Sequence, residues 1–188
     1  ILRKAIISGR IPSIIFWGPP GTGKTTLANI IANEVNVPFY ILSAISAGVK
    51  DVREVIAKVR PGQKNILFID EIHRFNKSQQ DALLGAVEKG KITLIGATTE
   101  NPSFEVNAAL LSRAQVYRLN SLTSEELNAI MMQAIEKDNT LKSYKIIIKQ
   151  TEAIFNLSGG DARKLLNLLE QVITSQKSNK AVVTDALV

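Results

Sequence analysis

Hydrophobic and polar positions follow two patterns along the chain, and the change comes close to residue 120. Before that point, short runs of consecutive apolar residues alternate with stretches in which apolar residues recur every three or four positions. The runs are typical of strands buried in a parallel sheet, and the stretches are typical of helices that cover it. We expect strands at 13–17, 38–42, 65–69, 92–98 and 114–119, and helices at 24–36, 49–60, 77–89 and 107–112. The alternation predicts an α/β fold with a five-stranded parallel sheet flanked by helices.

After Leu119 the strand pattern stops, and the remaining positions favour helices. Thr123, followed by Glu126 three positions later, is typical of a capped helix start. We expect helices at about 121–137 and 149–157, a third that Asp161 caps, and the start of a fourth over Ala181–Val188 with Thr184 as its cap. We therefore predict two domains, an α/β domain over residues 1–120 and a small all-helical domain over residues 121–188.

Composition excludes several classes of protein. The 188 residues are 45% hydrophobic and 21% charged, with a mean hydropathy of +0.08, which is typical of a soluble globular protein. The chain has no cysteine and one histidine, His73, which excludes a disulfide scaffold, cysteine catalysis and a histidine or thiolate metal cluster. No apolar run approaches the roughly 20 residues of a membrane span, and no secretion signal opens the chain. We expect a cytoplasmic protein with no membrane partner.

The positive charge is concentrated in the first domain. Residues 1–120 contain 15 Lys and Arg against 9 Asp and Glu, a net charge of +6, whereas residues 121–188 contain 8 of each. A basic domain suits a polyanionic partner such as a nucleotide or a nucleic acid. On charge alone, however, a solvated surface is the favoured interpretation, so the charge does not identify the partner.

A glycine-rich segment after the first expected strand carries the clearest chemical signal. It fits the pattern G-x-x-x-x-G-K-S/T, and it stands between an expected strand and an expected helix, which is the context that a phosphate-binding loop requires. Backbone N–H groups and the helix N-terminus would bind the phosphates, together with the Lys24 ammonium. The predicted nucleotide-binding residues are Gly18, Pro19, Pro20, Gly21, Thr22, Gly23, Lys24, Thr25 and Thr26.

Two carboxylates follow the buried run Ile66–Ile69. Asp70 and Glu71 stand where that strand is expected to end, and open α/β sheets bind their ligands at the carboxyl ends of the strands. We expect Asp70 and the Thr25 hydroxyl to hold Mg2+, and Glu71 to activate the attacking water. A surface cap is the alternative interpretation, but unpaired charge at the end of a buried strand is costly.

Together with three later residues, these motifs resemble the AAA+ ATPases. The resemblance assigns a polar sensor role near the γ-phosphate to Thr99. It assigns the arginine finger, supplied to a neighbouring subunit, to Arg113 in the segment LLSR, and the lid arginine to Arg163 in the segment GGDAR. It also implies that the helical domain forms a lid, and it adds Thr99, Arg113 and Arg163 to the catalytic residues Lys24 and Glu71.

Longer segments resemble one family within this class, the RarA/MgsA replication-associated recombination ATPases. They are WGPPGTGKTT at 17–26, DEIHRFNKSQQDALL at 70–84 and GATTENPSFE at 96–105. Sliding-clamp loaders carry Ser-Arg-Cys at the finger, where this chain has Ser112-Arg113-Ala114. The RuvB motor inserts a hairpin before its sensor strand, where this chain has only Lys89-Gly90-Lys91.

The family resemblance implies Mg2+-dependent ATP hydrolysis coupled to DNA at stalled or damaged replication forks. It implies ATP/ADP and Mg2+ as cofactors, and single-strand/duplex junction DNA, single-strand DNA-binding protein and replisome components as partners. It further implies a nucleoid-associated homo-oligomer, a tetramer in full-length members, whose C-terminal oligomerisation domain and adenine-binding N-terminal segment lie outside this chain. A nucleotide-switched clamp-loader-like factor and a Holliday-junction motor subunit are the alternatives.

The loop after the two carboxylates is ambiguous. His73 and Arg74 could report the nucleotide state or contact DNA, or they could belong to a helix-entry loop with Asn76 as the cap. We interpret Trp17, at the end of the first expected strand, as part of the core.

Overall fold

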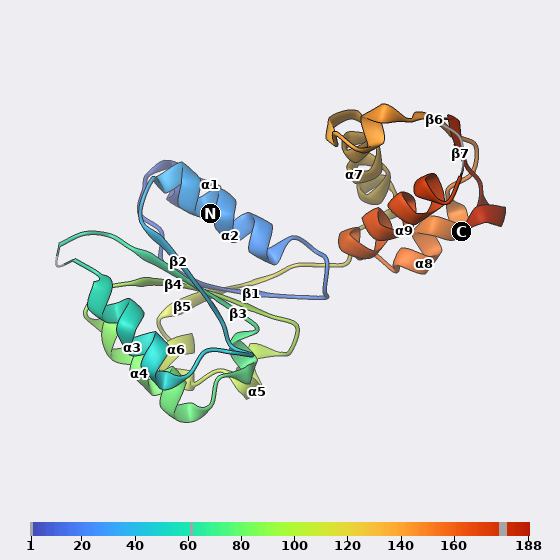
Figure 1. Ribbon diagram of the computed structural model, residues 1–188. Helices are drawn as coiled ribbons and strands as arrows, with labels where there is room; N and C mark the ends of the chain where they lie inside the picture. The colour runs from blue at the N-terminus through green and yellow to red at the C-terminus, as the bar shows by residue number, and fades with distance from the viewer. Residues whose placement is uncertain (1, 61, 177–179) are drawn as a thin grey trace. The chain divides into compact units, whose positions relative to one another are not determined.

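The computed structural model describes residues 2–60, 62–176 and 180–188, and the contacts divide the chain into two compact units. The first unit comprises Ile1–Gly18 and Gly23–Leu119, and the second comprises Pro19–Thr22 and Asn120–Val188. The first unit contains the larger of two sheets, and the second contains the helices that follow residue 120 (Figure 1).

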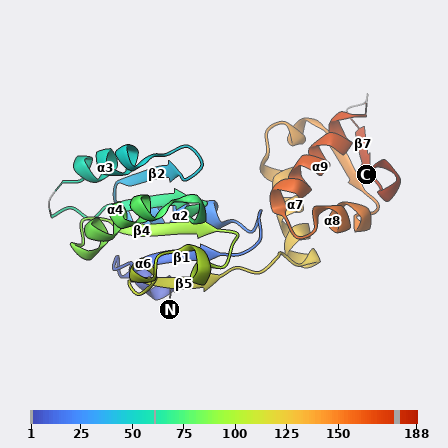
Figure 2. The ribbon, with the colours of Figure 1, turned by 90° about the horizontal axis from the view of Figure 1, so that it is seen from below.

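The first unit is built on a five-stranded sheet in which every described pairing is parallel. The strands are β1 (Ser13–Trp17), β2 (Phe39–Ser43), β3 (Ile66–Asp70), β4 (Thr93–Thr98) and β5 (Ala114–Arg118). Their order in the sheet is β2-β3-β4-β1-β5, which Figure 2 shows from below. The prediction of a five-stranded parallel sheet is confirmed, with strand bounds that differ by one or two residues.

Helices cover both faces of this sheet, as the apolar runs require (Figure 1). They are α1 (Leu2–Ile7), α2 (Lys24–Val35), α3 (Val49–Lys58), η1 (Ile72–Arg74), α4 (Lys77–Glu88), α5 (Pro102–Glu105) and α6 (Ala108–Leu111). The short α5 is not predicted from the sequence. Its signal is the Asn101 side chain, which caps Ser103, followed by a proline at the first helical position.

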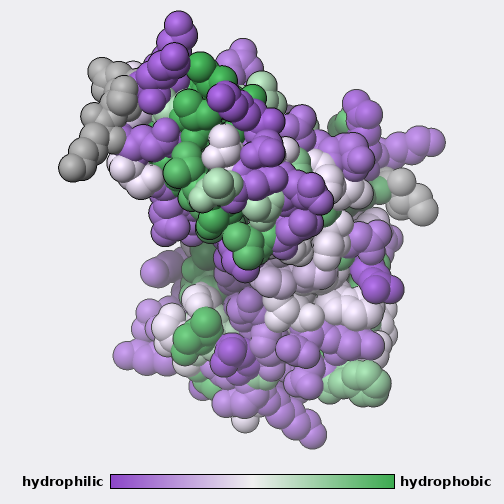
Figure 3. Space-filling view, turned by 90° about the vertical axis from the view of Figure 1, so that its right-hand side faces the viewer, coloured by the Kyte–Doolittle hydropathy of each residue, from purple (hydrophilic) through white to green (hydrophobic). Residues whose placement is uncertain are grey.

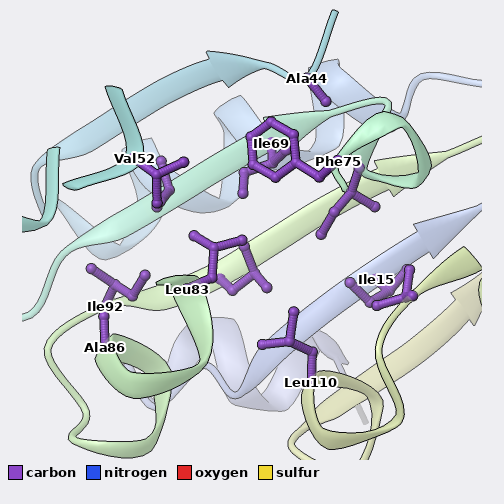
Figure 4. Close-up of a cluster of buried hydrophobic side chains, with 13 residues drawn as sticks. Ile15, Ala44, Val52, Ile69, Phe75, Leu83, Ala86, Ile92 and Leu110 are labelled. Atoms are coloured by element: carbon purple, nitrogen blue, oxygen red, sulfur yellow. The ribbon is translucent and has the colours of Figure 1, made fainter. Parts of the chain in front are cut away.

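Alternate residues of β1 belong to two separate cores. Ile14 and Phe16 pack with the buried face of α2, whereas Ile15 packs with Leu83 of α4 and Leu110 of α6 (Figure 4). All five side chains are buried. Since successive side chains of a strand point to opposite faces, a strand covered on both faces is apolar throughout. This packing fixes the strands, and with them the loops at their carboxyl ends.

The second unit corrects the prediction of an all-helical domain. Its helical elements are α7 (Ser124–Lys137), η2 (Leu141–Ser143), α8 (Glu152–Ser158), α9 (Ala162–Thr174) and η3 (Asp185–Leu187). It also contains a two-stranded parallel sheet of β6 (Lys145–Ile148) and β7 (Lys180–Val183). The helix expected from Ala181 is therefore wrong: β7 occupies its first half, and Thr184 makes no cap hydrogen bond with its side chain. Both strands have β-branched residues, which favour this geometry.

Capping at the N-termini of α7 and α9 agrees with the sequence. Thr123 and Glu126 form the expected reciprocal hydrogen bonds at the start of α7, and the Asp161 carboxylate accepts the backbone N–H groups of Arg163 and Lys164 at the start of α9. Hydrogen bonds at the α7 N-terminus lower the pKa of Glu125, chiefly through its own backbone N–H and then through Thr123.

The surface is mainly hydrophilic on the face that Figure 3 presents, where hydrophobic residues form smaller groups. Among the residues that the structure describes, none of the helices is both long enough and apolar enough to span a membrane.

Candidate active site

The glycine-rich loop joins the end of β1 to the start of α2. Its first residue, Gly18, donates its N–H to the Thr98 carbonyl oxygen of β4 at 3.1 Å. A Cβ on Gly18 would overlap the Leu119 carbonyl oxygen, so glycine alone fits there. Gly21 and Gly23 adopt positive φ angles of 69° and 87°, which side chains disfavour. The loop conformation therefore depends on glycines at three of its positions.

Lys24 opens α2 and lies within the loop rather than in solvent. Its side chain is 8% exposed, and its Nζ donates to the Gly18 carbonyl oxygen at 2.7 Å. Thr25 and Thr26 follow in the first turn of α2 and are exposed. A buried ammonium beside the N-terminus of a helix gives this loop a concentrated positive potential. The loop is therefore suited to bind an anion.

Asp70 and Glu71 lie at the edge of the sheet where the loop begins. Asp70 is the last residue of β3, and the register pairs Ile69 with Gly96 of β4. The same strand β4 pairs Thr98 with Trp17, the residue before Gly18. Because these strands are parallel, their carboxyl ends bring the acidic pair and the loop to one edge, separated by the width of β4.

Glu71 has an unusual backbone. Its φ of 54° and ψ of 48° are left-handed, one of two such conformations among the described residues that are not glycine. This conformation costs a side-chain-bearing residue free energy, of the order of 1–3 kcal/mol. The side chain is 28% exposed, yet its Oε2 is buried and forms no hydrogen bond within the described part of the chain. The turn thus holds a carboxylate oxygen that lacks a donor.

His73, whose role the sequence leaves open, and Thr98, to which no sequence motif points, also lie at the site. His73 Nδ1 lies 3.0 Å from the Thr98 hydroxyl and 3.2 Å from Glu71 Oε2. Thr98 is buried, and its hydroxyl also contacts the backbone of Glu100. The signal for Thr98 in the sequence is the threonine pair at the end of β4, of which the family resemblance gives a role only to the second. Thr99 follows the strand and is half-buried, and its proposed sensor role rests on the family resemblance.

The structure places Arg113 at the opposite edge of the sheet. It precedes β5, so it lies at the amino end of a strand whose carboxyl end is at the edge of Gly18 and Asp70. Its guanidinium forms an ion pair with Glu88 at 2.8 Å and donates to the Ala109 carbonyl oxygen and the Ser112 hydroxyl. The side chain remains 41% exposed. Arg113 is therefore held in one orientation on the surface, away from the acidic pair of its own chain.

Arg163 belongs to the second unit, as the second residue of α9. Its side chain is 73% exposed, and its Nε lies 3.8 Å from the Asp161 carboxylate. A contact of this length at such exposure contributes little to stability. The guanidinium is accordingly available to a ligand.

The oxygen donors at the site fit a magnesium ion. In the residues that the structure describes, no group of three or more His, Cys, Asp or Glu side chains could form a metal site of their own. Mg2+ is commonly held by one or two protein oxygens together with phosphate oxygens and water, so the Thr25 hydroxyl and the Asp70 carboxylate suffice. The chemistry of these donors matches a metal that arrives with a nucleotide.

Comparisons with known proteins point to one family. The family model described as "ATPase family associated with various cellular activities (AAA)" matches residues 14–122. Replication-associated recombination protein A of Escherichia coli K12 is 51% identical over 178 residues, which cover 91% of this chain and 40% of that protein. ATPase WRNIP1 of Dictyostelium discoideum is 47% identical over 186 residues, which cover 96% of this chain and 21% of that protein.

Among solved structures, the RuvB Holliday junction branch migration motor of Thermotoga maritima has a similar fold. It superposes with a TM-score of 0.78 at 30% sequence identity, covering 99% of this chain and 63% of that chain. The present chain spans less than half the length of the Escherichia coli and Dictyostelium relatives. The family match and these identities confirm the resemblance read from the motifs: the chain belongs to the AAA family of ATPases, in the group of replication-associated recombination protein A.

Proposed function

We propose that the chain is the catalytic core of a Mg2+-dependent ATPase. The observation that carries the proposal is the arrangement at the carboxyl edge of the sheet. There Lys24, with its buried ammonium, and Thr25 follow β1, whereas Asp70 and Glu71 stand at the end of β3. Only β4 separates these two strands in the sheet. An anion-binding loop beside two carboxylates is suited to phosphoryl transfer to water.

Each residue has a distinct task in this reaction. The backbone N–H groups from Gly21 to Thr25 bind the phosphate oxygens, because Pro19 and Pro20 have no N–H and the Gly18 N–H is donated to Thr98. Lys24 places its charge between the β- and γ-phosphates. Thr25 and Asp70 would hold Mg2+, which supplies charge neutralisation for the phosphates when bound. Glu71 orients the attacking water and accepts its proton.

Arg113 cannot complete the site of its own chain, and we assign it to a neighbouring subunit. A parallel strand rises about 3.3 Å per residue, so the length of β5 alone places Arg113 more than about 13 Å from the carboxyl edge of the sheet. A guanidinium held by Glu88 and 41% exposed can instead face the nucleotide of an adjacent copy. In the same proposal, Thr99 contacts the γ-phosphate and Arg163 closes on the nucleotide.

We further propose that hydrolysis is coupled to DNA in replication-associated recombination, in a homo-oligomer located at the nucleoid in the cytoplasm. The names of the relatives support this assignment. The charge of the surface also supports it. Three hollows of the first unit lie near the amino ends of its strands, and among the described residues they are lined by six exposed cations and no carboxylate. These cations are Arg10, Arg53, Arg60, Lys64, Lys89 and Lys91. Such a surface favours a polyanion.

The test of the catalytic assignment is Glu71→Gln in the intact protein. The amide keeps the size of the side chain but cannot accept a proton, so we expect ATP affinity to stay within about threefold while turnover falls by about a hundredfold or more. Glu34→Gln, at an exposed position of α2, is the matched control and leaves both unchanged. Equal loss of binding and turnover in Glu71→Gln would contradict the role of Glu71.

DNA coupling is tested separately with the unmodified protein. ATP turnover is measured with and without single-strand/duplex junction DNA, and we expect it to rise with DNA and to lose that stimulation as salt increases. Turnover that is the same with and without DNA would contradict the coupling while leaving the ATPase assignment intact.

A further inference from the structure

The Glu71 backbone has a defined conformation, but the carboxylate oxygen Oε2 accepts no hydrogen bond within the described part of the chain. The left-handed conformation of Glu71 sets the direction of its Cα–Cβ bond, and its carbonyl oxygen accepts the Arg74 N–H at 2.8 Å. Its buried Oε2 has no hydrogen bond in the described part of the chain. Leaving a buried carboxylate oxygen unpaired costs free energy, so a donor that can reach it would determine where the carboxylate rests.

His73 holds the nearest donor, and the partners of Thr98 fix its protonation. The Thr98 hydroxyl donates to the Glu100 carbonyl oxygen at 3.2 Å and accepts the Glu100 N–H at 3.0 Å. With its single proton used in this way, the hydroxyl can only accept from His73. This arrangement requires the proton on Nδ1 of His73, which hydrogen-bonds Thr98 Oγ1 at 3.0 Å. Glu71 Oε2 lies 3.2 Å from the same nitrogen but forms no hydrogen bond with it.

Thr98 also connects this pair to the phosphate-binding loop. Its carbonyl oxygen accepts the Gly18 N–H, and Trp17, the residue before Gly18, is its register partner in the sheet. His73 is 13% exposed and Thr98 is fully buried, so neither side chain can turn away into solvent without leaving a packed position. A continuous series of contacts thus runs from the loop through Thr98 and His73 to Glu71.

We propose that His73 is a positioning residue for Glu71: its Nδ1–H, held in place by the Thr98 hydroxyl, is the donor nearest to the Glu71 carboxylate, and so sets the orientation of the general base relative to the loop. This inference rests on the proposed role of Glu71. His73 contacts neither nucleotide nor water in this role, and its loss slows hydrolysis without weakening nucleotide binding.

Two replacements of His73 separate positioning from simple packing. In His73→Asn the amide nitrogen stands close to where Nδ1 was, whereas in His73→Gln it stands one bond further out, near the position of Nε2. We expect His73→Gln to lower kcat by about tenfold and His73→Asn by less than about threefold, with the ATP dissociation constant unchanged in both. A structural role would lower binding and turnover together and would not distinguish the two amides.

A second pair of variants keeps the test decisive if His73 variants fold poorly. Thr98→Ser retains the hydroxyl that orients His73, and Thr98→Val has a similar volume without it. We expect Thr98→Val, but not Thr98→Ser, to show the same loss of kcat at unchanged ATP affinity. Equal kcat in His73→Asn and His73→Gln, or in the two Thr98 variants, would overturn the positioning role alone. Full turnover in Glu71→Gln would overturn both this inference and the proposed catalytic role.

Discussion

Gly18 shows how tightly single residues determine this site. Its position between β1 and the loop leaves no room for a side chain, because a Cβ would overlap the Leu119 carbonyl oxygen. That carbonyl belongs to backbone, which cannot rotate away as the end of a flexible side chain can. The Gly18 N–H and carbonyl oxygen are also both engaged, with Thr98 and with Lys24. A shift of Gly18 would therefore move the buried ammonium as well.

Gly18→Ala is expected to damage binding and stability together. Relieving the overlap requires the backbone to move, and such overpacking costs about 1–3 kcal/mol of folding free energy. We expect ATP affinity to fall by about tenfold or more, measured by titration, with a lower urea midpoint. Gly23→Ala is the comparison, because a Cβ there meets no atom within 4 Å and only the positive φ disfavours it. An unchanged affinity in Gly18→Ala would contradict this account of the loop.

The sequence predicts some residues of the site but not others, and the reason is the distance along the chain. Lys24 and Thr25 belong to one contiguous motif, and Asp70 follows an apolar run that ends where a strand must end. The contact between His73 and Thr98 joins residues 25 positions apart. It depends on the register of β3 against β4 and on which of two adjacent threonines turns inward. Neither quantity is encoded in a local pattern.

At the scale of elements, two glycines have opposite surroundings. Gly85 lies in the middle of α4, is exposed, and a Cβ there meets no atom within 4 Å. Gly96 lies inside β4, and a Cβ there would stand 2.7 Å from Ile15 Cδ1 and 3.1 Å from Ile72 Cδ1, both on fully buried side chains. Gly85 therefore lowers the stability of the helix, because glycine gives the unfolded chain more conformational freedom. Gly96, in contrast, leaves the space that Ile72 of η1 occupies.

Substituting alanine at these positions should change stability in opposite directions. Gly85→Ala is expected to raise the free energy of unfolding by about 0.5–1 kcal/mol, because alanine reduces the freedom of the unfolded chain. Gly96→Ala is expected to lower it by about 1–3 kcal/mol, because the close-packed isoleucines must move. Urea denaturation of the two variants beside the unmodified protein measures both values. A Gly96→Ala variant at least as stable as the unmodified protein would show that close packing at Gly96 does not govern its cost.

The elements that sequence analysis missed are short and lack local partners. β6 and β7 have four residues each, and 31 residues separate the end of one from the start of the other. A run such as KIII or KAVV fits either a strand or a turn of a buried helix, because period alone cannot distinguish so few residues. The five strands of the large sheet were predictable because each is flanked by helices in a repeated order. β6 and β7 have no such repetition around them.

At the scale of the whole molecule, the proposed reaction requires residues from both ends of the strands of the large sheet. The carboxyl edge holds Lys24, Asp70 and Glu71, and the amino edge holds Arg113. A single copy cannot bring its own Arg113 to its own nucleotide, because the sheet is a rigid, packed layer between them. Two copies can do so if the amino edge of one approaches the carboxyl edge of the next. Turnover per chain should then rise with protein concentration.

Mixing two inactive variants tests this arrangement directly. Arg113→Ala removes the finger and keeps the nucleotide site, whereas Lys24→Ala damages the nucleotide site and keeps the finger. Alone, each should turn over ATP at least about a hundredfold more slowly than the unmodified protein. When the two variants are mixed at a concentration that permits assembly, some sites combine an intact Lys24 from one copy with an intact Arg113 from its neighbour. Turnover should then return in part, and the mixing ratio should determine how much of the unmodified protein's turnover is recovered. The double variant Glu88→Gln/Lys24→Ala lacks the ion pair of Arg113 but keeps the Arg113 guanidinium. When it is mixed with Arg113→Ala, activity should therefore still return. Mixtures no more active than their components, at a concentration where light scattering shows mixed assemblies, would exclude an arginine supplied by the neighbouring copy.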